Sequence, residues 1–87
     1  MDLLKLLFHR LNPPLFTIRV RNGSVSLAGG SATPAFIRDC GELASASGIT
    51  KGWIWATRRH GAVSLDFSSG IGGKDRQRFR NIAGLHR

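Results

Sequence analysis

The sequence predicts an α+β fold, in which a short N-terminal helix precedes the order ββαββα. Two observations carry this prediction. Two segments alternate apolar and polar residues around Asn22-Gly23 and around His60-Gly61, and glycine at the second turn position suits the two-residue loop of a β-hairpin. Each hairpin is then followed by a loop and a segment with helical periodicity. Two such units predict one four-stranded antiparallel sheet with both helices on one face.

The length and the charge of the chain restrict its function classes. A chain of 87 residues buries only about two-thirds of its unfolded surface, which leaves little room for a deep catalytic pocket. We expect residues 1–14 to form an amphipathic helix and a Pro-Pro linker, and residues 15–87 to form a single domain. The formal charge of +8 and the pI near 11.6 indicate attraction to a polyanion.

Residues 3–11 are predicted to form the amphipathic helix, which Asn12-Pro13-Pro14 ends because proline cannot continue the hydrogen-bond ladder. The apolar stretch is shorter than the about 20 residues needed to cross a bilayer. We therefore expect a cytoplasmic protein, with contact to a membrane surface as an alternative. The apolar side of this helix would be an interface made of Leu3, Leu4, Leu7, Phe8 and Leu11.

The alternation in each hairpin assigns its residues to two faces, because successive side chains of a strand point to opposite sides. In the second hairpin, Arg58 is expected opposite Val63, Ala56 opposite Leu65, and Ile54 opposite Phe67. The core face then holds Phe16, Ile18, Val20, Val25, Leu27, Ile54, Ala56, Leu65 and Phe67. The other face holds Thr17, Arg19, Arg21, Ser24, Ser26, Trp53, Trp55, Thr57, Ser64 and Asp66.

The segments after the hairpins carry helix signals. Thr33-Pro34 is a typical helix start, with threonine as the N-cap and proline in the first turn, and we expect this helix to run to Ser47 and stop at Gly48. Gly29-Gly30-Ser31 before it is expected to be a loop. A last helix is expected from Lys74 onward, with its apolar side made of Phe79, Ile82 and Ala83.

The combined pattern resembles a family of small bacterial proteins, domain of unknown function 3634. It consists of F-x-I-x-x-x-N-G-x-V, a P-x-F helix, L-x-F-S and a terminal R-Q-R-F-R-N-I, and it covers about residues 15–83. The resemblance implies no activity and no catalytic residue. It also implies an N-terminal segment through which family members look membrane-anchored, but the segment of this chain is shorter and charged.

The residues that could carry catalysis or bind a metal do not form a recognisable site. Cys40 lies on the apolar side of a predicted helix, where a free cysteine behaves as a small hydrophobe. The histidines lack ligand spacing, and the five acids form no carboxylate dyad. Gly70-Ile71-Gly72-Gly73-Lys74 is followed by Asp75 rather than the serine or threonine of a phosphate-binding loop. We predict a protein that is not an enzyme, with no cofactor, no metal and no small-molecule substrate.

The remaining function class is a protein that binds a partner. The lead hypothesis is recognition of RNA or single-stranded nucleic acid, because unpaired bases stack on exposed aromatic rings next to cations. The alternative is a protein-interaction or assembly subunit, including a homodimer, in which the N-terminal helix or a partner covers the tryptophans. The candidate binding residues are Arg19, Arg21, Trp53, Trp55, Arg59, Lys74, Arg76, Arg78 and Arg80.

Overall fold

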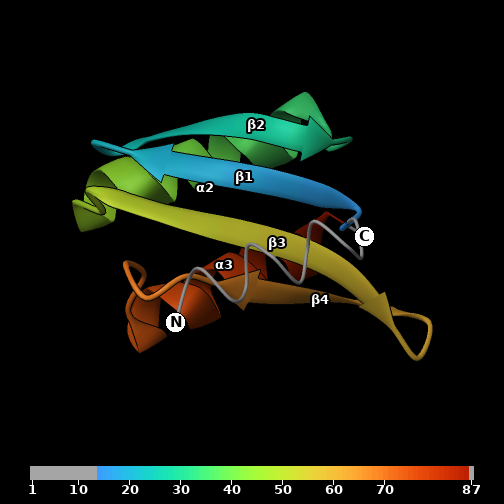
Figure 1. Ribbon diagram of the computed structural model, residues 1–87. Coiled ribbons are helices and arrows are strands. Elements are labelled where there is room, and N and C mark those ends of the chain that lie inside the picture. Colours follow the sequence, from blue (N-terminus) through green and yellow to red (C-terminus); the bar gives the residue numbers. More distant parts are fainter. Residues whose placement is uncertain (1–13, 87) are drawn as a thin grey trace.

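The computed structural model describes residues 14–86, which form the two predicted ββα units in one α+β fold. The helix predicted over residues 3–11 lies outside the described residues. Figure 1 shows the elements in chain order. They are β1 (Phe16–Arg21), β2 (Ser24–Gly30), α2 (Pro34–Ser47), β3 (Lys51–Arg59), β4 (Ala62–Phe67) and α3 (Gly73–Leu85).

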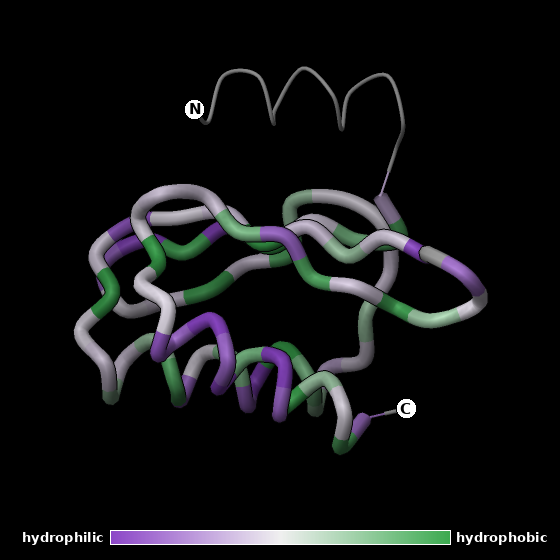
Figure 2. The backbone as a smooth tube through the Cα atoms, turned by 90° about the horizontal axis from the view of Figure 1, so that it is seen from below, coloured by the Kyte–Doolittle hydropathy of each residue, from purple (hydrophilic) through white to green (hydrophobic). Residues whose placement is uncertain are grey.

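The four strands form one antiparallel sheet in the order β2-β1-β3-β4. The two hairpins join through β1 and β3, where Ile18 lies opposite Ile54. Figure 2 shows both helices on the same side of the sheet, as predicted. The core fills the space between the sheet and the helices. Its buried members are Ile18, Val20, Phe36, Cys40, Ala44, Ile49, Ile54, Ala56, Leu65, Phe67, Ile71 and Phe79.

The two predicted turns have the backbone conformation that a two-residue hairpin loop requires. Asn22 and Gly23 have φ of 50° and 75°, and His60 and Gly61 have φ of 52° and 80°. Positive φ at both central positions defines the tight turn whose twist matches that of the flanking strands. The predicted pairs, such as Ala56 with Leu65, are confirmed.

The first helix has the bounds that its capping residues predict. Thr33 Oγ1 accepts a hydrogen bond from the Phe36 amide at 3.2 Å. At the other end Gly48 adopts φ 66° and donates its amide to the carbonyls of Ala44 and Ser45, which is a common helix ending. Neither described helix combines the length and the apolarity needed to cross a membrane.

Three details differ from the predictions, and all lie at strand ends or at a sheet edge. The loop predicted at Gly29-Gly30-Ser31 is wrong for its first two residues, because β2 extends to Gly30 and pairs it with Phe16. Leu27, expected in the core, is 41% exposed, because β2 is an edge strand with no neighbour on its far side. β3 begins at Lys51, before the expected start at Trp53.

Candidate nucleic-acid interface

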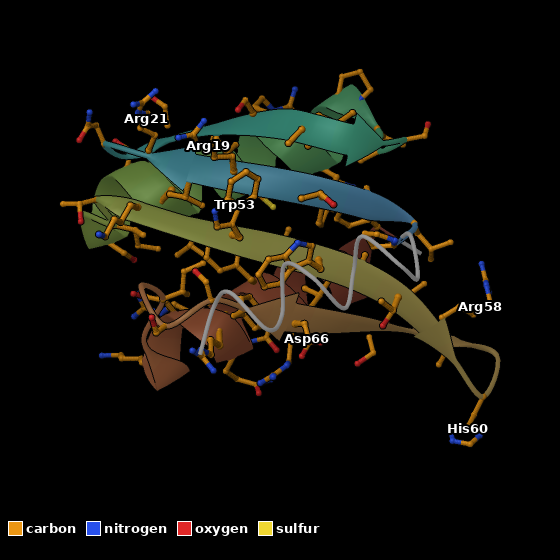
Figure 3. All side chains as sticks on the ribbon, viewed as in Figure 1. Arg19, Arg21, Trp53, Arg58, His60 and Asp66 are labelled. Carbon is orange, nitrogen blue, oxygen red and sulfur yellow. The ribbon has the colours of Figure 1, made fainter. Side chains whose placement is uncertain are left out.

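The face of the sheet turned away from α2 and α3, here called the outer face, carries a group of cations at one end. Register places Arg19 opposite Trp53 and Arg21 opposite Lys51, so all four side chains share this face. All three cations are exposed. In Figure 3 Arg19, Arg21 and Trp53 lie together, whereas Arg58 and His60 lie at the far end of the sheet.

Trp53 is held from two sides. On the outer face the guanidinium carbon of Arg19 lies 5.4 Å from the centroid of the indole ring, within the range of a cation–π contact. In the backbone, the Trp53 amide donates to Ser68 Oγ at 2.9 Å, and the Ser68 amide donates to the Trp53 carbonyl at 3.0 Å. The backbone of Trp53 is therefore held by Ser68, and its indole lies against Arg19 with part of the residue exposed.

Arg76 supports this arrangement from α3. Its Nε donates to the Ile71 carbonyl at 2.6 Å, and its Nη2 donates to the Ser68 carbonyl at 2.9 Å. Its guanidinium also lies 5.7 Å from the centre of the Phe67 ring. Since these donors hold the loop that orients Trp53, Arg76 is a positioning residue, and the structure gives it no place in an open phosphate-binding surface.

The loop after β4 brings the start of α3 to the cationic end of the sheet. Gly52 lies so close to this loop that a Cβ atom there would be 2.7 Å from the side chain of Ile71. Lys74, in the first turn of α3, is exposed beside the loop, and Figure 1 shows α3 beginning where β3 begins. We call this region the basic end, and its residues are Arg19, Arg21, Lys51, Trp53 and Lys74.

The remaining cations of α3 are placed differently. Arg78 Nη1 lies 3.9 Å from Asp75 Oδ1, so part of its charge is neutralised within the helix. Arg80 is exposed, with its guanidinium 5.2 Å from the Phe67 ring centre. Both belong to a helix that packs on the core side of the sheet, so the structure does not bring them onto the outer face with Arg19.

Trp55 points to the predicted face of the sheet, but its side chain is buried, whereas the lead hypothesis required it to be exposed. It lies opposite Thr17 and Asp66 on the outer face, yet it is only 1% exposed. It therefore offers no open surface for stacking a base. The adjacent Asp66 adds a carboxylate to the outer face next to Trp55.

Two further residues show what sequence reasoning misplaced. Arg59 ends β3, eight residues along the strand from Lys51, so its backbone lies far from Arg19 and Arg21. Lys51 was missed because the strand was expected to begin at Trp53. Extending the alternation of Trp53 and Trp55 back across Gly52 would have placed Lys51 on the outer face.

Cys40 is buried, and His86 is engaged with a carboxylate. Cys40 is fully buried, and burial together with the neighbouring carboxylate of Asp39 raises the pKa of its thiol to about 12. His86 Nε2 lies 2.7 Å from Asp39 Oδ2. Among residues 14–86, no three histidine, cysteine, aspartate or glutamate side chains are grouped as a metal site requires.

Comparison with known proteins identifies the family. A family model described as "Protein of unknown function (DUF3634)" matches residues 3–86. The chain belongs to this family. The resemblance that the sequence suggested is thereby confirmed, over a longer range than residues 15–83. No curated protein and no solved structure gives a significant match.

The structure explains the most specific part of the DUF3634 resemblance. The R-Q-R-F-R-N segment contains Arg76, which holds two loop carbonyls, and Phe79, which is fully buried and packs 6.1 Å from the ring of Phe67. Ser68, the last residue of L-x-F-S, bonds the backbone of Trp53. These residues of the DUF3634 pattern hold the fold together beneath the basic end.

Proposed function

We propose that this protein is a non-enzymatic module that binds single-stranded nucleic acid, RNA or DNA, through the basic end. The observation that carries the proposal is the register of β1 and β3, which sets the exposed Arg19, Arg21 and Lys51 around the partly exposed Trp53 on the outer face. Lys74 adds a further exposed cation at the same end.

The chemistry of this group suits an unpaired strand better than a duplex. Cations spaced along a strand can follow consecutive phosphates, and an aromatic ring on the same surface can stack on a base only if that base is unpaired. Arg19 already lies over the Trp53 ring, so a base would join or replace an existing cation–π contact. The net charge of +8 would accelerate the encounter with any polyanion.

Fluorescence anisotropy with a labelled oligouridine, measured over a range of salt concentrations, tests the proposal. The parent protein should bind and should weaken as salt rises. Replacing Arg19, Arg21 and Lys51 together by glutamine should reduce the log–log salt slope by about two, because each single-strand phosphate contact contributes about 0.7. A duplex of the same length should bind more weakly than the oligouridine.

Arg38→Gln is the matched control, because the Arg38 side chain is 69% exposed and belongs to α2, on the other side of the sheet. It removes one exposed positive charge, against three in the triple variant, without touching the basic end and should leave the slope almost unchanged. Absence of binding at low salt in the parent protein, or an equal loss in the Arg38 variant, would contradict the proposal.

The alternative, a protein-interaction or assembly subunit, depends on residues 3–11, which lie outside the described residues. Purification without nuclease separates the two functions. Excess absorbance at 260 nm that nuclease removes supports the nucleic-acid module. A stoichiometric protein that stays bound after nuclease treatment supports the assembly subunit.

A further inference from the structure

The end of the sheet opposite the basic end exposes apolar side chains. Among the described residues, the large apolar side chains with high exposure are Leu15 (41%), Leu27 (41%), Val63 (52%) and Leu85 (83%). Leu27 lies on the edge strand β2. The other three lie where β1 begins, where β4 begins and where α3 ends, and Figure 1 shows these three points at one end of the molecule.

A groove lies at this end of the molecule, and Val63 is among its lining residues. It encloses about 640 Å³ between the β3–β4 hairpin, the start of α2 and the last turns of α3. Val63 lines it directly, Leu15 precedes the lining residue Phe16, and Leu85 lies between the lining residues Gly84 and His86. The lining is mostly apolar and includes Phe16, Phe36, Val63, Leu65 and Ala83. We call this groove with Leu15, Val63 and Leu85 the apolar end.

Cations border the apolar end. Arg80 lines the groove and is exposed, and Arg58 lies directly opposite Val63 in the β3–β4 register and is also exposed. The nearby carboxylate of Asp39 is occupied by His86 at 2.7 Å and by Arg38 at 3.8 Å. The charge available to a partner at this end is therefore positive.

We infer that the apolar end docks on an anionic lipid bilayer. Exposed leucine and valine side chains flanked by Arg58 and Arg80 match the two layers of a membrane surface, because the apolar groups enter the acyl boundary while the guanidinium groups meet headgroup phosphates. A second copy of this chain fits poorly, since it would bring the same positive charges into contact. This inference concerns a different surface from the proposed nucleic-acid interface and does not depend on it.

Site-specific labelling tests the docking surface on the full chain. An environment-sensitive fluorophore is attached to Leu85→Cys and, in a second protein, to Leu27→Cys. Native Cys40 is fully buried and should not react, so each protein carries one label. Vesicles of equal parts phosphatidylcholine and phosphatidylglycerol should shift the emission of the label at position 85 to the blue and leave the label at position 27 unchanged. No shift at position 85, or an equal shift at both positions, overturns the inference.

Vesicle co-sedimentation measures the contribution of each group. Val63→Glu should lower the partition coefficient by about tenfold or more, because it removes an apolar side chain that would enter the bilayer and adds a charge that anionic lipids repel. Arg58→Gln should lower the partition coefficient by about fivefold. Leu27→Glu changes an exposed apolar position elsewhere on the protein and should leave the coefficient unchanged. Vesicles of phosphatidylcholine alone should bind weakly. Binding that is insensitive to Val63→Glu, with folding verified by circular dichroism, overturns the proposal.

Discussion

Trp53 and Trp55 point to the same face of β3 but have different surroundings. Trp53 is partly exposed beneath the guanidinium of Arg19, whereas Trp55, two residues further along, is 1% exposed. Direction from a sheet is set by the alternation of the strand, but exposure is set by what else reaches that point. A candidate binding residue therefore needs both properties, and only Trp53 has them.

This difference predicts distinct fluorescence for the two tryptophans. Trp53→Phe leaves Trp55 as the emitter, and its emission should be blue and resist acrylamide quenching because its indole is shielded from water. Trp55→Phe leaves Trp53, which should emit at longer wavelength with a higher Stern–Volmer constant. Acrylamide is preferred to iodide because the charge of +8 would concentrate an anionic quencher. Equal quenching of the two variants would contradict the assigned exposures.

At the scale of the elements, the hairpins and the helix caps were predictable because their determinants are local. Asn22-Gly23 fixes its own turn, and Thr33 and Gly48 mark the two ends of α2 within the sequence that they cap. The pairing of β1 with β3 joins segments far apart in the chain, and no local residue pattern encodes it. Lys51 was missed for a local reason, because the strand was expected to begin at Trp53. The direction of Trp55 was predicted correctly, but its burial was expected only under the alternative hypothesis, in which the tryptophans are covered.

The elements also explain how Arg76 of α3 supports the basic end without belonging to its surface. Arg76 reaches from α3 to two carbonyls of the loop after β4, and Ser68 of that loop bonds the backbone of Trp53 on both of its polar groups. A chain of contacts therefore runs from α3 through the loop to β3. Changes in α3 should affect Trp53 through stability rather than through direct ligand contact.

Arg76→Gln is therefore expected to destabilise the fold by about 2 kcal/mol, because it removes two hydrogen bonds from a charged donor to partly buried carbonyls. Arg78→Gln is the control in the same helix. It breaks only an exposed 3.9 Å pair with Asp75 and should change the unfolding free energy by less than about 0.5 kcal/mol. Urea unfolding followed by circular dichroism measures both. Equal midpoints for the two variants would show that Arg76 has no supporting role.

At the scale of the whole molecule, β3 runs between two chemically different ends, the basic end at Lys51 and the apolar end beside Arg59. From Lys51 to Arg59 the strand spans about 26 Å at about 3.3 Å per residue, several times the screening length of about 8 Å in physiological salt. Charges at the basic end and ligands at the apolar end should therefore influence one another little. The two proposed surfaces can be occupied at the same time if both proposals hold.

Simultaneous occupancy gives the last prediction. A labelled oligouridine should co-sediment with phosphatidylcholine–phosphatidylglycerol vesicles only when the protein is present. Replacing Arg19, Arg21 and Lys51 by glutamine should abolish recruitment of the oligonucleotide while most of the protein still sediments, because the apolar end is intact. Leu85→Glu should leave both the protein and the oligonucleotide in the supernatant, although binding in solution continues. If the oligonucleotide instead releases the parent protein from the vesicles, the two anionic ligands compete for one surface, and the separation of the ends into two binding sites is wrong.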